Sequence, residues 1–274
     1  KNNAAPPRRE DIIMKKIIVL TLCLLMCLSL CACGGKTGKQ TLVVGFDAEF
    51  PPFGFVNENG EYDGFDLALA KELCARLGWE FKAVAINWDS KDNELATGSI
   101  SCIWNGFTCT GREDEYTWSD AYVDNSIVVV VKADSGIQSL ADLAGKTVMV
   151  QSASSGADAL NGNTALKDTL KQVVELGDYN LGFMELKQGS VDAIVVDQGV
   201  AAYQIANNEG NYIILDEAVS TEQYAVGFLK GNTELRDQVN AELLKMAQDG
   251  TMEKIGENYV KDGLVLESLC LCKK

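Results

Sequence analysis

Apolar residues occur along this chain in short continuous runs, and between these runs they recur at helical spacing. Residues 41–46 form an apolar run that ends at an acidic, Pro-rich loop over 47–52, which is typical of a strand followed by a loop. Residues 65–77 predict an amphipathic helix, and the runs at 79–86 and 101–104 predict two further strands. In the helix the apolar positions lie four apart, at Phe65, Leu69, Leu73 and Leu77, with Gly78 as the stop. Strands and helices that alternate in this way indicate a parallel α/β sheet.

The same alternation restarts after a strongly β-branched, extended segment at 127–132. The elements expected after it are a helical turn at 140–143, a strand at 146–150, a helix from Ala157, a strand at 191–196, a helix at 199–206, and two final helices, one ending at Gly250 and one over 252–260. No internal repeat of solenoid period is present. We therefore expect two α/β lobes joined by extended segments rather than one large sheet.

The first part of the chain has the pattern of a secretory signal. The basic pair Lys15-Lys16 precedes an apolar run at 17–33 that is short for a membrane span. The run ends Leu30-Cys31-Ala32-Cys33-Gly34, which resembles the lipobox of bacterial lipoproteins and makes Cys33 the expected lipidation site. The alternative is an uncleaved anchor helix. In both cases residues 1–33 are extension and signal, 34–40 are a linker, and the folded part lies outside the cytoplasm.

Charge and composition exclude several functions. The net charge is −15, and residues 34–274 carry 19 basic and 37 acidic residues, so the surface repels phosphate backbones and nucleic-acid binding is not expected. The chain contains no histidine, which excludes Ser–His–Asp and Cys–His catalysis and imidazole metal ligands. An enzyme would have to work with carboxylates, Lys, Tyr or Cys.

Only three arginines follow the signal, and one of them stands in a loop that suits ligand binding. Arg76 and Arg236 occupy polar helix positions, whereas Arg112 ends the loop after the third predicted strand. Loops at the carboxyl ends of parallel strands bind ligands in α/β folds, and a guanidinium there suits a carboxylate. The alternative is a surface arginine that pairs with Glu113 or Asp114.

Four further features complete a candidate site for a zwitterion. The segment 151–156 follows a strand and opens a helix, where it either binds an anion or caps the helix through a serine. Asp197 ends an apolar strand and is a candidate for an ammonium group. Phe50 and Trp88 stand in loops after strands, where aromatic rings either contact a small ligand or pack. With Arg112, these features match the two charged ends and the side chain of an amino acid.

At this point the chain resembles the amino-acid solute-binding proteins of bacterial ABC importers, family 3, over residues 42–260. The resemblance rests on Gly45-Phe46-Asp47 to Pro52-Phe53, Gly64-Phe65-Asp66-Leu67-Ala68, Gly106-Phe107-Thr108 to Arg112, Trp118-Ser119-Asp120, Leu140 to Lys146, Val191-Asp192-Ala193 to Asp197, and Asp249-Gly250-Thr251. It implies a two-lobed α/β fold of the type II periplasmic-binding-protein kind, with hinge crossings near 124–128 and 220–224. The implied domains are lobe 1 at 41–125 and 223–263, lobe 2 at 126–222, and a tail at 264–274 without a family counterpart.

The resemblance also implies roles for the two charged ends of the ligand. Arg112 would bind the ligand carboxylate, helped by the amides around Thr108 and Thr110 and by Ser154. Asp197 would take the α-ammonium.

The rest of the implied pocket concerns the ligand side chain. Phe50 and Trp88 would flank it, and Asn105 and Gly106 would line the pocket floor. These residues permit polar, aromatic or aliphatic ligands, and Asp47 adds the option of a second positive charge. The choice among these ligands stays open.

The chain departs from the family's pattern in several places. Ala153 stands where the family usually has glycine, and Ser154 replaces the commoner threonine. The loop before Arg112 is one residue shorter than the usual form, and Ser101 replaces an aspartate.

The expected function is therefore extracytoplasmic capture of a free amino acid and its delivery to an ABC permease and its ATPase by a monomeric, lipid-anchored protein. No catalytic residue, metal or cofactor is expected. Cys74 and Cys102 lie in apolar patterns that indicate buried thiols. The alternatives are an enzyme on the same fold, a dehydratase or transglycosylase with Asp47 or Glu49 as acid/base, and a ligand-sensing module.

Overall fold

The computed structural model describes residues 39–273, and the chain from Gln40 onward forms one compact unit. The predicted signal at 1–33, nearly all of the linker at 34–40 and the predicted lipidation site Cys33 lie outside the described residues. Within residues 39–273, no helix combines the length and the apolar character needed to cross a membrane.

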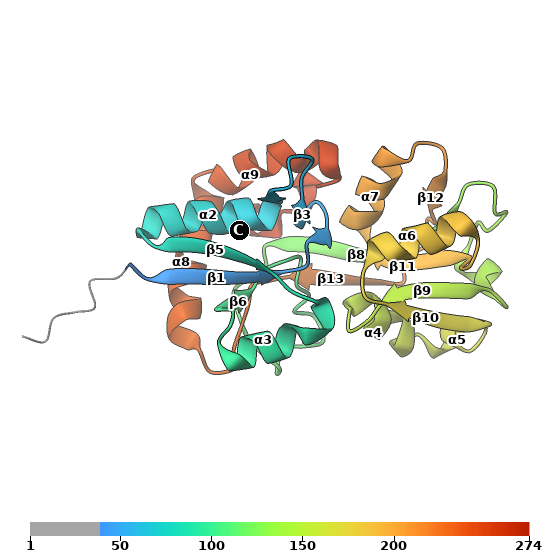
Figure 1. Ribbon diagram of the computed structural model, residues 1–274, viewed down its shortest axis with the longest axis horizontal. Coiled ribbons are helices and arrows are strands. Elements are labelled where there is room, and N and C mark those ends of the chain that lie inside the picture. The colour runs from blue at the N-terminus through green and yellow to red at the C-terminus, as the bar shows by residue number, and fades with distance from the viewer. Residues whose placement is uncertain (1–38, 274) are drawn as a thin grey trace, which may run out of the picture. The chain divides into compact units, whose positions relative to one another are not determined.

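The compact unit contains two main sheets, each the centre of one lobe (Figure 1). The sheet of lobe 1 has the order β5-β1-β6-β14-β7, in which β1 pairs in parallel with β5 and β6, and β14 pairs antiparallel with β6 and β7. Its strands are β1 (Thr41–Phe46), β5 (Glu80–Ala85), β6 (Cys102–Ile103), β7 (Thr117–Trp118) and β14 (Gly227–Phe228). Lobe 1 is therefore built from two separate stretches of the chain.

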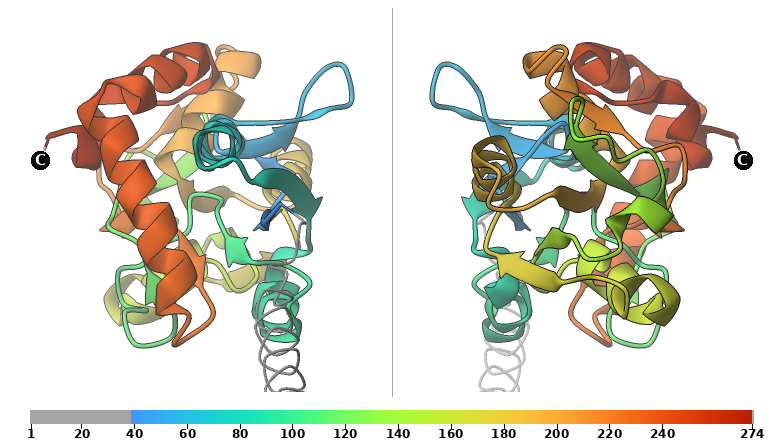
Figure 2. Two further views of the ribbon diagram at one scale, coloured as in Figure 1. Left: turned by 90° about the vertical axis from the view of Figure 1, so that its left-hand side faces the viewer. Right: turned by 90° about the vertical axis from the view of Figure 1, so that its right-hand side faces the viewer.

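Helices and a small antiparallel sheet surround the lobe 1 strands. The helix α2 (Phe65–Leu77) confirms the predicted helix at both ends, because Gly78 adopts the left-handed conformation that ends it. The helix α8 (Thr233–Gln248) is the long orange helix in the left view of Figure 2, and it buries Val239, Leu243 and Met246. The other elements are β2 (Glu49–Phe50), β3 (Gly54–Val56), β4 (Tyr62–Asp63), η1 (Trp88–Ser90), α3 (Lys91–Thr97), α8 (Thr233–Gln248), α9 (Thr251–Gly256) and η3 (Glu257–Asp262).

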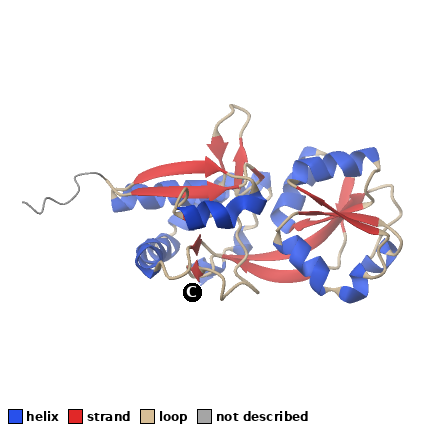
Figure 3. Cartoon of the chain, turned by 60° about the horizontal axis from the view of Figure 1, so that its bottom comes forward, coloured by secondary structure: helices blue, strands red, loops and turns tan. Residues whose placement is uncertain are grey.

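The sheet of lobe 2 is mixed, in the order β10-β9-β11-β8-β12, with helices on both faces (Figure 3). Strands β9, β10 and β11 are parallel, and β8 runs antiparallel to β11. The elements are β8 (Val123–Lys132), η2 (Leu140–Leu143), β9 (Thr147–Gln151), α4 (Ser155–Gly162), α5 (Thr164–Lys167), β10 (Gln172–Leu176), α6 (Tyr179–Gln188), β11 (Ala193–Asp197), α7 (Gln198–Asn207) and β12 (Tyr212–Ile214). The sequence pattern did not predict β10 or α6.

Two antiparallel strands connect the lobes, and we call them the hinge strands. They are β8 and β13 (Ser220–Tyr224), paired from Val123 opposite Tyr224 to Ile127 opposite Ser220. The predicted crossings at 124–128 and 220–224 fall on this pair. The residue boundaries predicted for the two lobes stay a prediction.

The C-terminal tail, which had no predicted role, packs into the molecule. Leu264, Leu269 and Leu271 are buried and belong to the main apolar cluster, and the turns η4 (Leu266–Ser268) and η5 (Cys270–Lys273) contact β8. Cys74 and Cys102 are buried in lobe 1, as their apolar surroundings predicted.

The packing of the tail predicts a stability difference between two neighbouring substitutions. Leu269 is 1% exposed, so Leu269→Ala should lower the free energy of unfolding by about 2–5 kcal/mol through lost burial and a cavity. Val265 is 42% exposed, and Val265→Ala should cost less than about 1 kcal/mol. Urea unfolding of both variants measures the difference. Equal effects would show that the tail does not contribute to the core.

Candidate functional site

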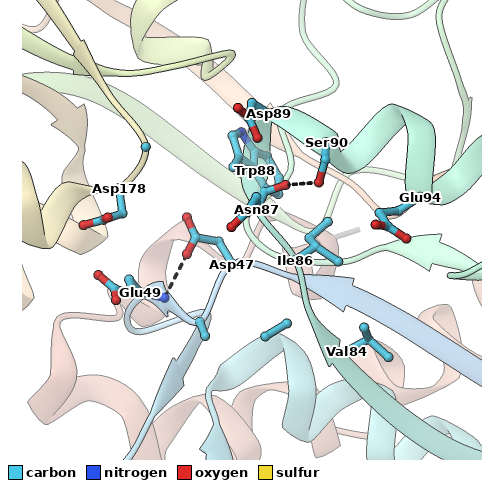
Figure 4. A pocket seen from close by; sticks show the side chains of 13 residues that line it. Asp47, Glu49, Val84, Ile86, Asn87, Trp88, Asp89, Ser90, Glu94 and Asp178 are labelled. Atoms are coloured by element: carbon cyan, nitrogen blue, oxygen red, sulfur yellow. Dashed lines mark hydrogen bonds between the residues drawn. The ribbon is translucent and has the colours of Figure 1, made fainter.

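A cavity of about 540 Å³ lies where the two lobes face each other (Figure 4). Lobe 1 contributes the loops that follow β1 and β5, and lobe 2 contributes the loop between β10 and α6. The carboxyl ends of parallel strands thus form one wall, which is the usual ligand position in α/β sheets. The lining residues are Asp47, Ala48, Glu49, Val84, Ala85, Ile86, Asn87, Trp88, Asp89, Ser90, Glu94, Gly177 and Asp178.

Carboxylates dominate the polar lining of this cavity. Five of the lining residues are acidic, and none is Lys or Arg. Burial raises the pKa of Asp47, and burial together with the neighbouring Asp178 carboxyl raises the pKa of Glu49. Figure 4 shows Asp47, Glu49 and Asp178 facing a common space. Within residues 39–273, no group of three or more His, Cys, Asp and Glu side chains is arranged to hold a metal ion.

Asp47 is held rigidly and joins the two lobes. Its Oδ1 accepts a hydrogen bond from the Glu49 amide at 2.9 Å, and its Oδ2 accepts one from Gln151 Nε2 at 2.6 Å. Gln151 ends β9 in lobe 2, so this bond crosses the cleft. A charge-assisted bond of this kind fixes the direction in which the carboxylate points.

Lys91, which packs against Trp88, makes a second connection across the cleft. The Trp88 ring packs edge-on against Phe107, with ring centroids 5.5 Å apart, and Lys91 Nζ lies 5.2 Å from the centroid of the Trp88 ring. Lys91 is only 4% exposed, burial lowers its pKa, and its ammonium donates to the carbonyl of Ala153 in lobe 2 at 3.1 Å. Ala153 has a φ of +55°, which explains why the family prefers glycine at this position.

A second group of polar side chains lies at the hinge strands, around Asp197 and Glu222. Asp197 Oδ1 accepts from Tyr224 Oη at 2.5 Å and from Asn125 Nδ2 at 2.9 Å. Glu222 Oε1 accepts from the same Asn125 nitrogen at 2.9 Å and from Thr108 Oγ1 at 2.7 Å. Burial, followed by the charge of Glu222, raises the pKa of Asp197 to about 8.

Arg112 lies beside this group and reaches lobe 2. Its Nη2 donates to Asp158 Oδ2 at 2.6 Å, and its guanidinium lies 5.7 Å from the centroid of the Phe107 ring. The side chain is 11% exposed, and burial raises the pKa of Glu222 while the Arg112 charge opposes that rise. Among the described residues Arg112 pairs with Asp158 and not with Glu113 or Asp114, the alternative that the sequence left open. The Glu113 carboxylate accepts from the Gly111 amide.

Gly106 and Asn105, which were expected to line the pocket floor, are buried and do not line the cavity. The Gly106 amide donates to the buried carboxylate of Asp66 at 2.6 Å, which anchors the loop that carries Thr108. A Cβ atom at Gly106 would lie 2.9 Å from the Phe50 ring, and the φ of +54° also favours glycine. Asn105 is buried beside Gly54.

The remaining predicted site residues occupy different surroundings. Phe50 is buried against Tyr179, with ring centroids 6.1 Å apart, and does not line the cavity. Ser154 caps α4 by accepting from the Ala157 amide at 3.1 Å, so its hydroxyl has the capping role that the sequence left open. Thr110 is exposed, and its hydroxyl accepts from the Gln223 amide of β13.

The structure therefore brings Asp47 and Trp88 together at the cavity, and Thr108, Arg112 and Asp197 together around Glu222. Their roles toward a ligand stay predictions. Sequence reasoning missed the polar side chains contributed by the hinge strands and by the two interlobe contacts. These are Lys91, Asn125, Gln151, Glu222 and Tyr224. The available signal was the alternation in β13, which places Glu222 and Tyr224 on one face.

The buried carboxyls predict how stability depends on pH. The pKa of Asp66 is raised to about 7 and that of Asp197 to about 8, both from an ordinary value of 3.8. The folded state therefore binds more protons than the unfolded state between about pH 4 and 8, and these groups make the free energy of unfolding fall as the pH rises. Asp197→Asn should give a shallower fall, measured by urea unfolding at pH 5, 6.5 and 8. A slope identical to that of the unaltered protein would refute this.

Comparisons with known proteins agree with this architecture. The chain matches the family described as bacterial extracellular solute-binding proteins, family 3, over residues 42–262. It is 29% identical over 254 residues to the arginine-binding extracellular protein ArtP of Bacillus subtilis, covering 90% of this chain and 98% of that protein. It is 31% identical over 274 residues to the ABC transporter glutamine-binding protein GlnH of the same organism, covering 91% and 98%.

A solved structure shows the same fold. The substrate-binding protein of an ABC uptake transporter from Streptococcus pneumoniae, with bound histidine, superimposes with a TM-score of 0.78 at 30% identity, covering 82% of this chain and 94% of that one. The two-lobed α/β fold of the type II periplasmic-binding-protein kind, predicted from the sequence, is thus confirmed. The chain belongs to the bacterial extracellular solute-binding proteins of family 3.

Proposed function

We propose that this protein captures a free amino acid with a positively charged side chain and delivers it to an ABC importer by lobe closure. The observation that carries the proposal is the interlobe cavity, whose lining holds five carboxylates and neither Lys nor Arg. A cationic side chain placed there attracts these carboxylates and so compensates for the hydration that they lose on burial.

Membership of the family supports the general part of this function. The chain is an extracytoplasmic amino-acid-binding protein of an ABC importer, as the family and the relatives of similar length indicate. The similarity to an arginine-binding protein is in line with a cationic ligand, whereas the glutamine-binding relative shows that the fold alone does not select it.

The charged ends of the amino acid fit the group of side chains at the hinge. Arg112 would bind the carboxylate, because a guanidinium has five N–H donors and Asp158 engages only Nη2. Thr108, the amide near Thr110 and the N-terminus of α4 at Ser154 would assist it. Asp197 would accept the α-ammonium.

The ligand side chain would then extend from the hinge toward the cavity. Trp88 supplies an apolar wall, and Asp47, Glu49 and Asp178 supply negative charge from both lobes. A ligand that touches carboxylates of both lobes favours the closed arrangement, because those contacts exist only when the lobes meet.

The same geometry favours binding over catalysis. Both oxygens of Asp47 accept hydrogen bonds, one from the Glu49 amide and one from Gln151, which leaves this carboxyl poorly placed to exchange protons with a substrate. We therefore propose a non-enzymatic, monomeric binding protein with lobe 1 at 41–125 and 223–263, lobe 2 at 126–222, and a lipid anchor at Cys33.

The charge of the cavity predicts discrimination between two ligands of nearly equal shape. L-arginine and L-citrulline differ chiefly in the charge of the terminal group, so L-arginine should bind at least about tenfold more tightly, which corresponds to about 1.4 kcal/mol. Asp178→Asn should reduce this ratio, because asparagine still caps α6 but carries no charge. Titration calorimetry measures both affinities.

Matched controls keep this experiment specific. Asp216→Asn removes an exposed charge from lobe 2 outside the cavity lining and should leave the ratio unchanged. Arg112→Ala should weaken both ligands, since both share the α-carboxylate. Equal affinity for the two ligands would overturn the cationic class, and an unchanged affinity in Arg112→Ala would overturn the placement of the carboxylate.

A further inference from the structure

Glu222 is a buried carboxyl at the hinge that the assigned binding roles do not use. It is 8% exposed and lies on the same buried face of β13 as Tyr224. Its Oε1 accepts hydrogen bonds from Thr108 Oγ1 in lobe 1, from Asn125 Nδ2 on the hinge and from Ser155 Oγ in lobe 2. One oxygen therefore gathers donors from both lobes and from the hinge.

Asn125 ties this carboxyl to the residue proposed for the ammonium. Its Nδ2 lies 2.9 Å from Glu222 Oε1 and 2.9 Å from Asp197 Oδ1. Two oxygens at that distance from one nitrogen are at most about 6 Å apart, the range in which one carboxylate disfavours ionisation of the other. Asp197 is 2% exposed, so water screens neither charge effectively.

The groups that face the pair compensate only part of its charge. Tyr224 donates to Asp197, and the buried Tyr179 ring and the Cys109 thiol are neutral neighbours whose pKa values are raised by burial. Arg112 is the cation that acts on Glu222, and it is already paired with Asp158. Two ionised carboxyls and one shared guanidinium leave the site with an excess negative charge.

We propose that Asp197 and Glu222 form a two-carboxyl receptor for the α-ammonium of the ligand, which holds one proton in the free protein and releases it to solvent when the ammonium binds. This inference rests on the proposed function. In the free protein the shared proton supplies the missing positive charge. In the complex the ammonium supplies this positive charge and both carboxyls are ionised. Binding of one ammonium therefore releases one proton to solvent.

The raised pKa of Asp197 agrees with this geometry. The pKa of Asp197 is raised to about 8, with burial as the largest cause and Glu222 as the second. Burial also raises the pKa of Glu222, but its hydrogen-bond donors and the charge of Arg112 oppose that rise. At neutral pH the proton therefore resides chiefly on Asp197. Because binding expels it, affinity should rise with pH up to about pH 8, by close to tenfold per pH unit.

Proton release can be measured directly on the full chain with L-arginine as the probe. Titration calorimetry at pH 7 in phosphate and in Tris, which differ in ionisation enthalpy, gives the number of protons released per ligand bound. The unaltered protein should release close to one proton. Glu222→Gln, which keeps the shape but removes the second charge, should release at most about half as many, since the pKa of Asp197 falls.

A control on the outer side of the hinge separates this effect from a general change of charge. Asp124 is exposed on β8 and accepts from Gln223 Nε2, so Asp124→Asn removes one charge near the hinge but outside the pair. This variant should release as many protons as the unaltered protein. Any protons released from Asp47 and Glu49 contribute equally in all three proteins. The difference in the number of protons released between Glu222→Gln and the other two proteins therefore measures the contribution of Asp197 and Glu222.

The outcomes distinguish this inference from the proposed function. Binding of L-arginine without proton release, or equal release by Glu222→Gln, overturns the two-carboxyl receptor and leaves the amino-acid function intact. Failure of the unaltered protein to bind any amino acid overturns both. If Glu222→Gln does not fold, the pH dependence of affinity in the unaltered protein decides, because an affinity that is flat between pH 5.5 and 8 contradicts the inference.

Discussion

The structure depends on negative charge that is buried between two lobes and only partly balanced by fixed cations. Asp47 lines the interlobe cavity, Asp197 and Glu222 lie in the polar group at the hinge strands, and all three are less than one-tenth exposed. Removing carboxylates from water is costly unless hydrogen bonds, protons or cations replace the lost hydration. Here hydrogen bonds replace part of it, and we propose that a proton in the free protein and the positive groups of the ligand in the complex replace the rest.

The fold brings these carboxylates together from different elements of the two lobes. Asp47 and Trp88 follow the carboxyl ends of two parallel strands of lobe 1. Asp197 ends β11 in lobe 2, and Glu222 lies in the hinge strand β13. Since these elements belong to different lobes, the favourable contacts exist only when the lobes meet. In the proposed function, ligand recognition and lobe closure are therefore one process, driven by the same interactions.

The sequence predicted those helices and strands that are marked by a regular apolar pattern and a clear stop residue. The helix Phe65–Leu77 has a four-residue apolar period and a glycine stop, and both its ends were predicted correctly. The strand β10 and the helix α6 were missed, because β10 has no fully buried position and gives no clear apolar run.

The site was only partly predictable for a related reason. Arg112 is the first charged residue of the loop after an apolar strand, and Asp197 ends an apolar strand, so sequence reasoning singled them out. Glu222 lies among polar residues of a short strand and has the pattern of a surface position. Its burial arises only when β13 pairs with β8 and Thr108 and Ser155 approach from the two lobes, which are contacts between distant parts of the chain.

The central claim is that the unbalanced carboxylates select a ligand with two positive groups. A crystal structure of the full chain with L-arginine tests it most directly. We expect the ligand guanidinium within about 4 Å of Asp47, Glu49 or Asp178, and the α-ammonium against Asp197. A complex in which the guanidinium points away from this cavity, or in which the α-carboxylate lies nearest Asp197, would contradict the account.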